Sequence, residues 1–250
     1  MLVHQLQCFG LEPGTGNTAL VIEHDDKQPA ARQAFARQQN RSACVFIDGA
    51  TLDYYYPHMR SPLCLHATLA AAHILFAARP QATRIGVTTA LRGQPLQLVR
   101  GANGLYIELR RQPAPKPALP AALVASLLNA ELVSAPLVAS VGSAKLLLEV
   151  ADRAALQALR PDLARIAAWG QAEGVNGCYV YCRRADGTFE GRNFNHLDPA
   201  LEDRATGVAA GALTAVLQRG LTLFQTDCRI DTRLDGDAIL VGGATELMPA

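Results

Sequence analysis

The sequence predicts an α+β protein of two pseudo-symmetric domains, each a strand-rich, barrel-like sheet around a central helix, with a cleft between them. Two observations carry this prediction. A segment at 64–72 recurs at 202–210: each copy places polar, chemically able residues just before an alanine-rich run, and Thr68 falls on Thr206. The helix predicted over 206–217 is apolar on every side and uncharged, so strands are expected to enclose it.

Composition narrows the class of protein. The chain has 250 residues, of which 50% are hydrophobic and 18% are charged, and its formal net charge is +1. These values are typical of a folded globular protein and indicate neither disorder nor nucleic-acid binding. No apolar run approaches the roughly 20 residues of a membrane span, and the first nine residues read as a strand instead of a signal peptide. We therefore expect a cytoplasmic protein with no membrane partner.

The cysteines predict free thiols and no metal site. Six are scattered along the chain, and only Cys178 and Cys182 lie close together in sequence. Their spacing places both on one face of a strand, with no second pair nearby to complete a tetrahedral zinc site. Reduced, mostly packed thiols are the expected outcome.

The first half alternates strands and helices. A strand over 2–9 leads into the turn-rich stretch 12–17, and the alanine-rich helix over 66–79 is stopped by Pro80, which cannot continue a helix. Another helix is predicted over 29–39. The remaining strands are predicted over 18–23, 44–47, 51–56, 83–89, 95–100 and 104–110.

Repeated proline at 113–120 indicates a linker, because proline continues neither a sheet ladder nor a helix. We therefore predict domains at 1–113 and 114–250, with the last strand a candidate to cross over to the first domain. The second half repeats the plan of the first. Its helices are predicted over 119–129, 154–159, 162–168 and 205–219, and its strands over 136–141, 144–150, 177–183, 188–194, 221–230 and 238–243.

Four motifs stand out along the chain: Gly16–Ala19, Asn40–Phe46, Pro62–Thr68 and Glu202–Ala209. Together they resemble the phenazine-biosynthesis (PhzF-like) isomerase family, which shares its fold with diaminopimelate epimerase and proline racemase. Gly16–Ala19 is similar to the family's Gly-Asn-Pro-Ala turn, and Asn40–Phe46 to its Asn-Leu-Ser-Glu-Thr-Ala-Phe. Pro62–Thr68 is similar to Pro-Phe-(Ala/Cys)-Gly-His-(Ala/Pro)-Thr, and Glu202–Ala209 to Glu-Asp-Pro-Ala-Thr-Gly-Ser-Ala. The resemblance implies a cofactor-independent enzyme that binds a small carboxylate between its domains and moves a proton on carbon.

The chain departs from the family pattern at several positions, and three of them bear on the isomerase chemistry first. Ala43 stands where the family has its catalytic glutamate, and alanine has no proton to move. Leu65 replaces the glycine before the histidine, and Val208 replaces the serine after Thr-Gly. The resemblance therefore supports the fold more strongly than the family's own isomerase chemistry.

Four residues are the candidate catalytic groups. Cys64 lines up with the catalytic thiol of the diaminopimelate epimerase and proline racemase families, and a helix N-terminus stabilises a thiolate. His66 matches the family's site histidine, with an ordinary pKa suited to proton transfer near neutrality. Asp203 and Glu202 are candidates for the opposing acid or base, although capping of a helix start explains them about equally well. The partner thiol of those families would fall on Arg204, which speaks against a symmetrical two-thiol racemase.

Seven residues are the candidate substrate-binding groups. Amide, hydroxyl and backbone N–H groups suit this role, although turn chemistry or capping explains most of these residues almost as well. Arg204, in place of the family's proline, is expected either to clamp a carboxylate or to lie on the surface as a solvated charge. The candidates are Asn17, Ser42, Leu65, Arg204, Thr206, Gly207 and Val208.

Three functions remain open on the sequence alone. The first is a cofactor-independent isomerase or epimerase acting on a small amino-acid-like or cyclic carboxylate. The second is a catalytically degenerate relative that keeps the site as a small-molecule binding module, as Ala43 suggests. The third is an interaction protein with an empty cleft, as a homodimer. Cys64 and the acidic pair favour the first.

Overall fold

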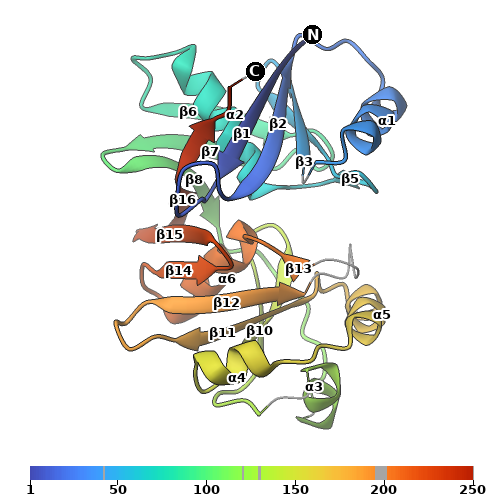
Figure 1. Ribbon diagram of the computed structural model, residues 1–250, viewed down its shortest axis with the longest axis vertical. Coiled ribbons are helices and arrows are strands. Elements are labelled where there is room, and N and C mark those ends of the chain that lie inside the picture. The colour runs from blue at the N-terminus through green and yellow to red at the C-terminus, as the bar shows by residue number, and fades with distance from the viewer. Residues whose placement is uncertain (42, 120, 129–130, 195–201, 250) are drawn as a thin grey trace. The chain divides into compact units, whose positions relative to one another are not determined.

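The computed structural model describes residues 1–41, 43–119, 121–128, 131–194 and 202–249. These residues form two compact units (Figure 1). Unit 1 comprises Met1–Leu109, Asp227–Arg229 and Leu240–Ala250, and unit 2 comprises Arg110–Thr226 and Ile230–Ile239. The chain thus leaves unit 1 four residues before the predicted boundary at 113/114, and its last residues return to unit 1.

Unit 1 is a mixed sheet that holds one buried helix. The helix α2 (Leu65–Ala77) has almost every side chain buried and contacts β1, β2, β3, β7 and β17, so its lack of charge matches its enclosed position. The strands are β1 (Leu2–Cys8), β2 (Asn17–Glu23), β3 (Ala43–Asp48), β4 (Thr51–Tyr55), β5 (Arg60–Ser61), β6 (Arg84–Thr89), β7 (Pro95–Gly101), β8 (Gly104–Arg110) and β17 (Thr245–Leu247).

The helix α1 (Pro29–Gln39) packs over a core that includes Ile22, Phe46 and Tyr55. It also carries a buried cation, Arg32, which is 6% exposed. The Arg32 guanidinium contacts three aspartates. They are Asp25 at 3.0 Å, Asp48 at 2.6 Å and Asp53 at 3.4 Å. A charge this well buried is tolerated because several carboxylates surround it.

Unit 2 has helices on both faces of its sheet. The apolar side chains of α3, α4 and α5 pack with one face of β10 and β11, while α6 contacts β9 and β10 (Figure 1). The helices are α3 (Ala121–Leu128), α4 (Arg153–Ala158), α5 (Leu163–Glu173) and α6 (Gly207–Leu217). The strands are β9 (Leu137–Ser140), β10 (Ala144–Glu149), β11 (Cys178–Arg183), β12 (Phe189–Phe194), β13 (Glu202–Asp203), β14 (Thr222–Gln225), β15 (Cys228–Asp235) and β16 (Ala238–Gly243), of which the last two also contribute residues to unit 1.

The order of strand pairings repeats between the units. In unit 1, β1 pairs β2 antiparallel, β2 pairs β3 parallel, β3 pairs β4 antiparallel, and β4 pairs β6 parallel. In unit 2 the same sequence of pairings runs through β9, β10, β11, β12 and β14. The helices α2 and α6 occupy equivalent places in this order, each between the two strands of the last parallel pair.

The structure corrects the predicted alignment of the two helix starts. Cys64 is the residue that caps α2 and Thr206 is the residue that caps α6, so Cys64 and not Thr68 corresponds to Thr206. The predicted alignment fails because β4 and β5 are separated by 56–59, whereas β12 and β13 are separated by the longer segment 195–201. Pairing of alanine-rich runs by sequence alone cannot detect that insertion.

One predicted strand is broken in the structure. The strand predicted over 221–230 is divided into β14 and β15 at Thr226, whose φ of 54° reverses the chain. A β-branched residue seldom adopts this left-handed conformation, so sequence pattern gave no turn signal there. Among the helices of the described residues, none is long and apolar enough to cross a membrane.

Candidate functional site

One group of candidate residues lies at the start of α2 in unit 1. Cys64 precedes the helix in an extended conformation, and its carbonyl oxygen accepts hydrogen bonds from the Thr68 N–H at 2.9 Å and the Thr68 hydroxyl at 2.7 Å. The Tyr54 hydroxyl lies 2.7 Å from the same Thr68 oxygen. These buried contacts fix the backbone of Cys64 and therefore the position of its Cβ atom.

Cys64 and His66 form a buried thiol–imidazole pair. Cys64 is 3% exposed, His66 is 6% exposed, and the Cys64 Sγ lies 3.4 Å from the His66 Nδ1. Burial by itself raises the pKa of Cys64. The charge of His66, hydrogen bonds from His66 and Tyr56, and the Ala67 backbone outweigh burial, so the pKa of the Cys64 thiol is lowered. The arrangement favours the thiolate form of Cys64.

Two other thiols of unit 1 behave in the opposite way. Burial raises the pKa of Cys44 to about 12, and the nearby Cys64 adds to this effect. The pKa of Cys8 is also raised, first by burial and then by the charge of Cys64. Of these three thiols, Cys64 therefore ionises most readily, because it has a histidine partner.

Asn17 begins β2, is 3% exposed and pairs with Cys8 across the sheet. The preceding Gly16 has a φ of 110°, and a Cβ there would lie 2.5 Å from the Cys8 carbonyl oxygen. The turn before Asn17 therefore requires glycine.

Two further positions of unit 1 were singled out in the sequence. Leu65 is the first residue of α2 and is 3% exposed, and Ala43 begins β3 at 1% exposed. The Ala43 position is thus filled by a buried methyl group. Ser42, a predicted substrate-binding residue, lies outside the described residues.

A second group of candidate residues lies at the start of α6 in unit 2. The Thr206 hydroxyl donates to Asp203 Oδ2 at 2.7 Å. Gln225, which is 1% exposed, accepts from the Thr206 N–H at 3.2 Å and donates to the Asp203 carbonyl oxygen. Asp203 is thus held at the strand end next to the helix start. Gly207 is the first residue of α6 and Val208 the second, so their N–H groups belong to the helix end that lacks intrahelical acceptors.

Glu202 has a different environment from Asp203. Arg192 holds its carboxylate in a fork, with Nε 2.9 Å from one oxygen and Nη2 2.8 Å from the other. Successive side chains of a strand point to opposite faces, so Glu202 and Asp203 cannot both serve the same face of β13. The geometry gives Glu202 a structural partner and leaves Asp203 as the carboxylate beside the start of α6.

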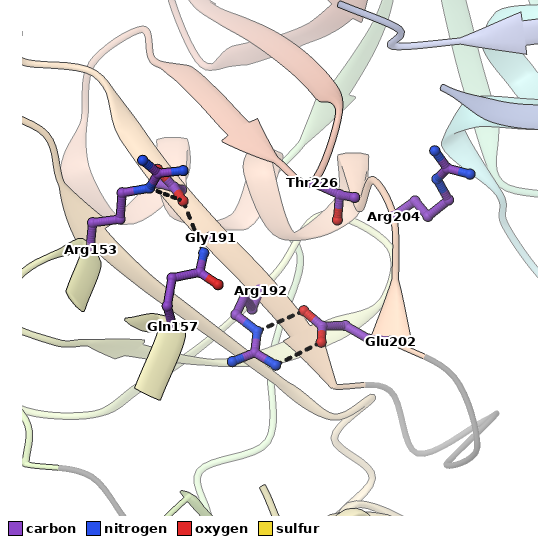
Figure 2. A pocket seen from close by; sticks show the side chains of 8 residues that line it. Arg153, Gln157, Gly191, Arg192, Glu202, Arg204 and Thr226 are labelled. Carbon is purple, nitrogen blue, oxygen red and sulfur yellow. Dashed lines mark hydrogen bonds and ion pairs between the residues drawn. The ribbon is translucent and has the colours of Figure 1, made fainter. Parts of the chain in front are cut away.

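A polar pocket of about 510 Å³ lies on the Glu202 side of unit 2 (Figure 2). The Arg204 side chain is directed away from the Arg192–Glu202 pair, and Arg204 is exposed. Cys64 and Thr206 hold equivalent cap positions, so Thr206 is the residue of unit 2 that stands where unit 1 has its thiol. The pocket is lined by Arg153, Gln157, Glu190, Gly191, Arg192, Glu202, Arg204 and Thr226.

Several residues of this environment were not singled out by sequence reasoning. Gln225 and Tyr56 contact the candidate groups, but no motif marks them. Lys145 did carry a signal, because it is the one charged residue in the apolar run 144–148. It is 1% exposed in the structure. No group of three or more histidine, cysteine or acidic side chains able to hold a metal ion is present in the described part of the chain.

Comparison with known proteins identifies the family of the chain. The family described as phenazine biosynthesis-like protein matches residues 6–238. An uncharacterized isomerase of Deinococcus radiodurans is 30% identical over 233 residues, covering 85% of this chain and 75% of that protein. The uncharacterized isomerase YddE of Salmonella typhimurium is 29% identical over 238 residues, covering 86% of this chain and 78% of that protein.

Solved structures show the fold. A predicted epimerase from Pseudomonas aeruginosa superposes with a TM-score of 0.77 at 27% identity, covering 99% of this chain and 96% of that one. A hydroxyproline epimerase from Agrobacterium vitis superposes with a TM-score of 0.63 at 11% identity, covering 99% and 90%. The chain shares the fold of these structures, as its motifs predicted.

Proposed function

The chain belongs to the phenazine biosynthesis-like protein family, and on that premise we propose that it is an isomerase or epimerase that moves a proton on a carbon atom of a small carboxylate. The substrate class is amino-acid-like or cyclic, and the reaction uses no cofactor. The names of the relatives as isomerases and of a structural neighbour as an epimerase support this class of reaction.

The Cys64–His66 pair is the observation that carries the proposal. A proton-transfer enzyme without a cofactor needs groups that ionise near neutral pH. In this family context the expected glutamate is replaced by Ala43, which cannot exchange a proton. The lowered pKa of Cys64 and its 3.4 Å separation from His66 support a thiolate–imidazolium pair as the replacement.

Asp203 is the second proton-transfer group of the proposal. In each turnover one group removes the proton, the electron pair of the broken C–H bond stays on the substrate, and the other group returns a proton to carbon. The N–H groups of Gly207 and Val208, together with the positive end of the α6 dipole, suit the substrate carboxylate. Arg204 is exposed near the same helix start and is the candidate clamp for that carboxylate.

The proposal is tested by deuterium exchange from solvent into the α-carbon of a panel of amino acids, hydroxy acids and cyclic carboxylates. We expect one class to exchange, and Cys64→Ser and Asp203→Asn each to slow exchange by about 100-fold or more. If both groups act on one substrate, the double variant is no slower than the slower single variant.

Cys44→Ser and Glu202→Gln are the matched controls, because each removes a neighbouring group of the same chemistry that the proposal does not use. We expect both to retain exchange within about threefold. Exchange that survives in Cys64→Ser and Asp203→Asn would rule out these roles.

The alternative is a small-molecule binding module, which the buried methyl group of Ala43 favours. A ligand present at 100 times its dissociation constant adds about 2.7 kcal/mol to the apparent stability. A thermal shift with a panel carboxylate that shows no exchange would select this alternative over the enzyme. We expect that shift to be lost in Arg204→Ala.

A further inference from the structure

Unit 2 contains a row of buried polar side chains that ends at Asp203. Tyr179 on β11 pairs with Asn193 on β12, and Asn193 pairs with Asp203 on β13. Lys145 on β10 lies on the same face, because its neighbour two residues on, Leu147, pairs with Tyr179. We call these four residues the Asp203 row.

This row faces α6 and not the apolar core on the other side of the sheet. The alternate residues of the same strands, among them Leu146, Leu148, Cys178 and Val180, belong to the apolar core that packs with α3, α4 and α5. Side chains alternate along a strand, so the Asp203 row projects to the opposite face.

Three members of the row are buried, and their polar side-chain atoms lack hydrogen-bond partners within the described part of the chain. Lys145 is 1% exposed, and Tyr179 and Asn193 are both fully buried. The Lys145 Nζ, the Tyr179 hydroxyl and both amide atoms of Asn193 have no hydrogen-bond partner among the described residues. The Tyr179 hydroxyl lies over Gly191, where a Cβ would come within 2.2 Å of it. A polar cluster of this kind is costly in a protein interior unless it serves a charge or a bound group.

The ionisable groups around Lys145 leave one clear partner. Asp203 and Cys178 are the groups whose charges act on Lys145, and Asp203 has the larger effect. The neighbouring elements β9, α6 and β14 carry no ionisable side chain in their sequences. On β12, Glu190 contacts Arg153 and Arg192 contacts Glu202, so these charges are already paired.

We propose that Lys145 is the buried countercharge of Asp203, that Tyr179 and Asn193 provide the polar surroundings of this pair, and that Lys145 thereby makes Asp203 the proton acceptor of the reaction. The assignment of the acceptor rests on the proposed function; the charge pair does not.

The start of α6 and the start of α2 thereby take different roles. A cation on the same face of the sheet favours a carboxylate at the end of the row, and a carboxylate can accept the proton from the substrate carbon. The imidazolium of His66 then returns a proton to carbon. Lys145 acts through Asp203 and is a positioning residue.

Nuclear magnetic resonance of the lysine side chains tests the charge pair directly. The chain has only three lysines, so a sample labelled at lysine Cε and Nζ gives three signals. Lys27→Arg and Lys116→Arg assign the two exposed lysines without touching the row. We expect Lys145 to titrate with a pKa of about 8, because burial lowers it and Asp203 only partly opposes this.

In Asp203→Asn we expect the pKa of Lys145 to fall by about one further unit, because the negative charge of Asp203 is gone. Glu202→Gln is the matched control, since it removes a carboxylate from the adjacent residue on the opposite face of β13. It should leave the Lys145 titration within about 0.2 pH units of the wild type. An unchanged titration in Asp203→Asn, or an equal shift in Glu202→Gln, overturns the proposal.

The role in the reaction has a separate readout. In Lys145→Met we expect the turnover number of deuterium exchange to fall by about 10-fold while the KM of the substrate stays within about twofold, because Asp203 loses its countercharge. An unchanged turnover number, or an equal loss through KM alone, overturns the acceptor role. If the wild type exchanges no substrate, the proposed function fails, and with it the acceptor role, while the lysine titration still decides the charge pair.

Discussion

The reactivity of Cys64 is the sharpest consequence of the candidate site. We expect Cys64 to be alkylated by iodoacetamide at pH 7 faster than Cys44, although both are buried, and to lose this advantage in His66→Asn. The reason is the thiolate, which is the reacting form and which His66 stabilises. His73→Asn is the matched control, because it removes a partly buried histidine from the same helix that contacts Thr245 instead of the thiol.

The magnitude follows from the environment of Cys44. With a pKa of about 12, roughly one Cys44 side chain in 10⁵ is ionised at pH 7, against about 3% for an ordinary cysteine. A thiolate of higher pKa is a better nucleophile, with a Brønsted coefficient of about 0.45, which recovers a factor of about 40. Cys44 should therefore react about 100-fold more slowly than an ordinary thiol of the same accessibility, and Cys64, whose pKa is lowered, should react faster than Cys44. Loss of His66 should slow Cys64 by at least about 10-fold, because burial then raises the thiol pKa without an opposing charge.

The assay is quenched alkylation followed by peptide mass spectrometry, with unfolded protein as the reference for an ordinary thiol. His73→Asn should leave the rate at Cys64 within about twofold. The reasoning is refuted if Cys64 reacts no faster than Cys44 in the folded wild type, or if His66→Asn slows it by less than about threefold.

Three further predictions concern stability, measured by urea unfolding. Lys145 has a pKa of about 8 in the folded state against 10.5 for the ordinary group, so the folded state binds fewer protons between these two pH values. The free energy of unfolding of the wild type should therefore rise by about 3 kcal/mol relative to that of Lys145→Met between pH 8 and pH 10.5. A difference that does not change with pH would contradict the burial of the lysine charge. Gly16→Ala should lower the free energy of unfolding by at least about 2 kcal/mol, because a Cβ at this position meets backbone atoms. Gly14→Ala is also at positive φ but in open space, and it should lower this free energy by about 1 kcal/mol. Equal losses would show that the close contact is not the cause. Arg32→Met should lower the free energy of unfolding by about 3 kcal/mol, because it leaves buried aspartates without their cation. Arg153 is exposed, so Arg153→Met should lower this free energy by at most about 1 kcal/mol. Similar losses in the two variants would show that the Arg32 network contributes little.

Much of the secondary structure is readable from the sequence because its signals are local. Pro29 at the start of α1 and Pro80 after α2 mark helix limits by the geometry of proline. The uncharged composition of α2 and α6 predicts their burial, since no side chain requires solvent. The division at Thr226 was not predictable, because a β-branched residue at positive φ is supported by its surroundings and not by its own preference.

The candidate site was predicted only in part. Cys64, His66 and Asp203 were found because they lie in motifs next to a helix start. The roles of Asp203 and Glu202 were not separable in sequence, whereas strand alternation and the Arg192 fork separate them in space. Gln225 reaches Asp203 from a strand 22 residues away, and no sequence pattern links the two.

By itself, the sequence determined the family, the two apolar helices and the thiol with its histidine two residues on, because each depends on neighbours in the chain. Only the tertiary structure decided that Cys64 corresponds to Thr206 and that Lys145 lies buried in the row that ends at Asp203. The physical reason is that loop length and strand register set these relations. Both act across the sheet, between residues that the chain keeps far apart.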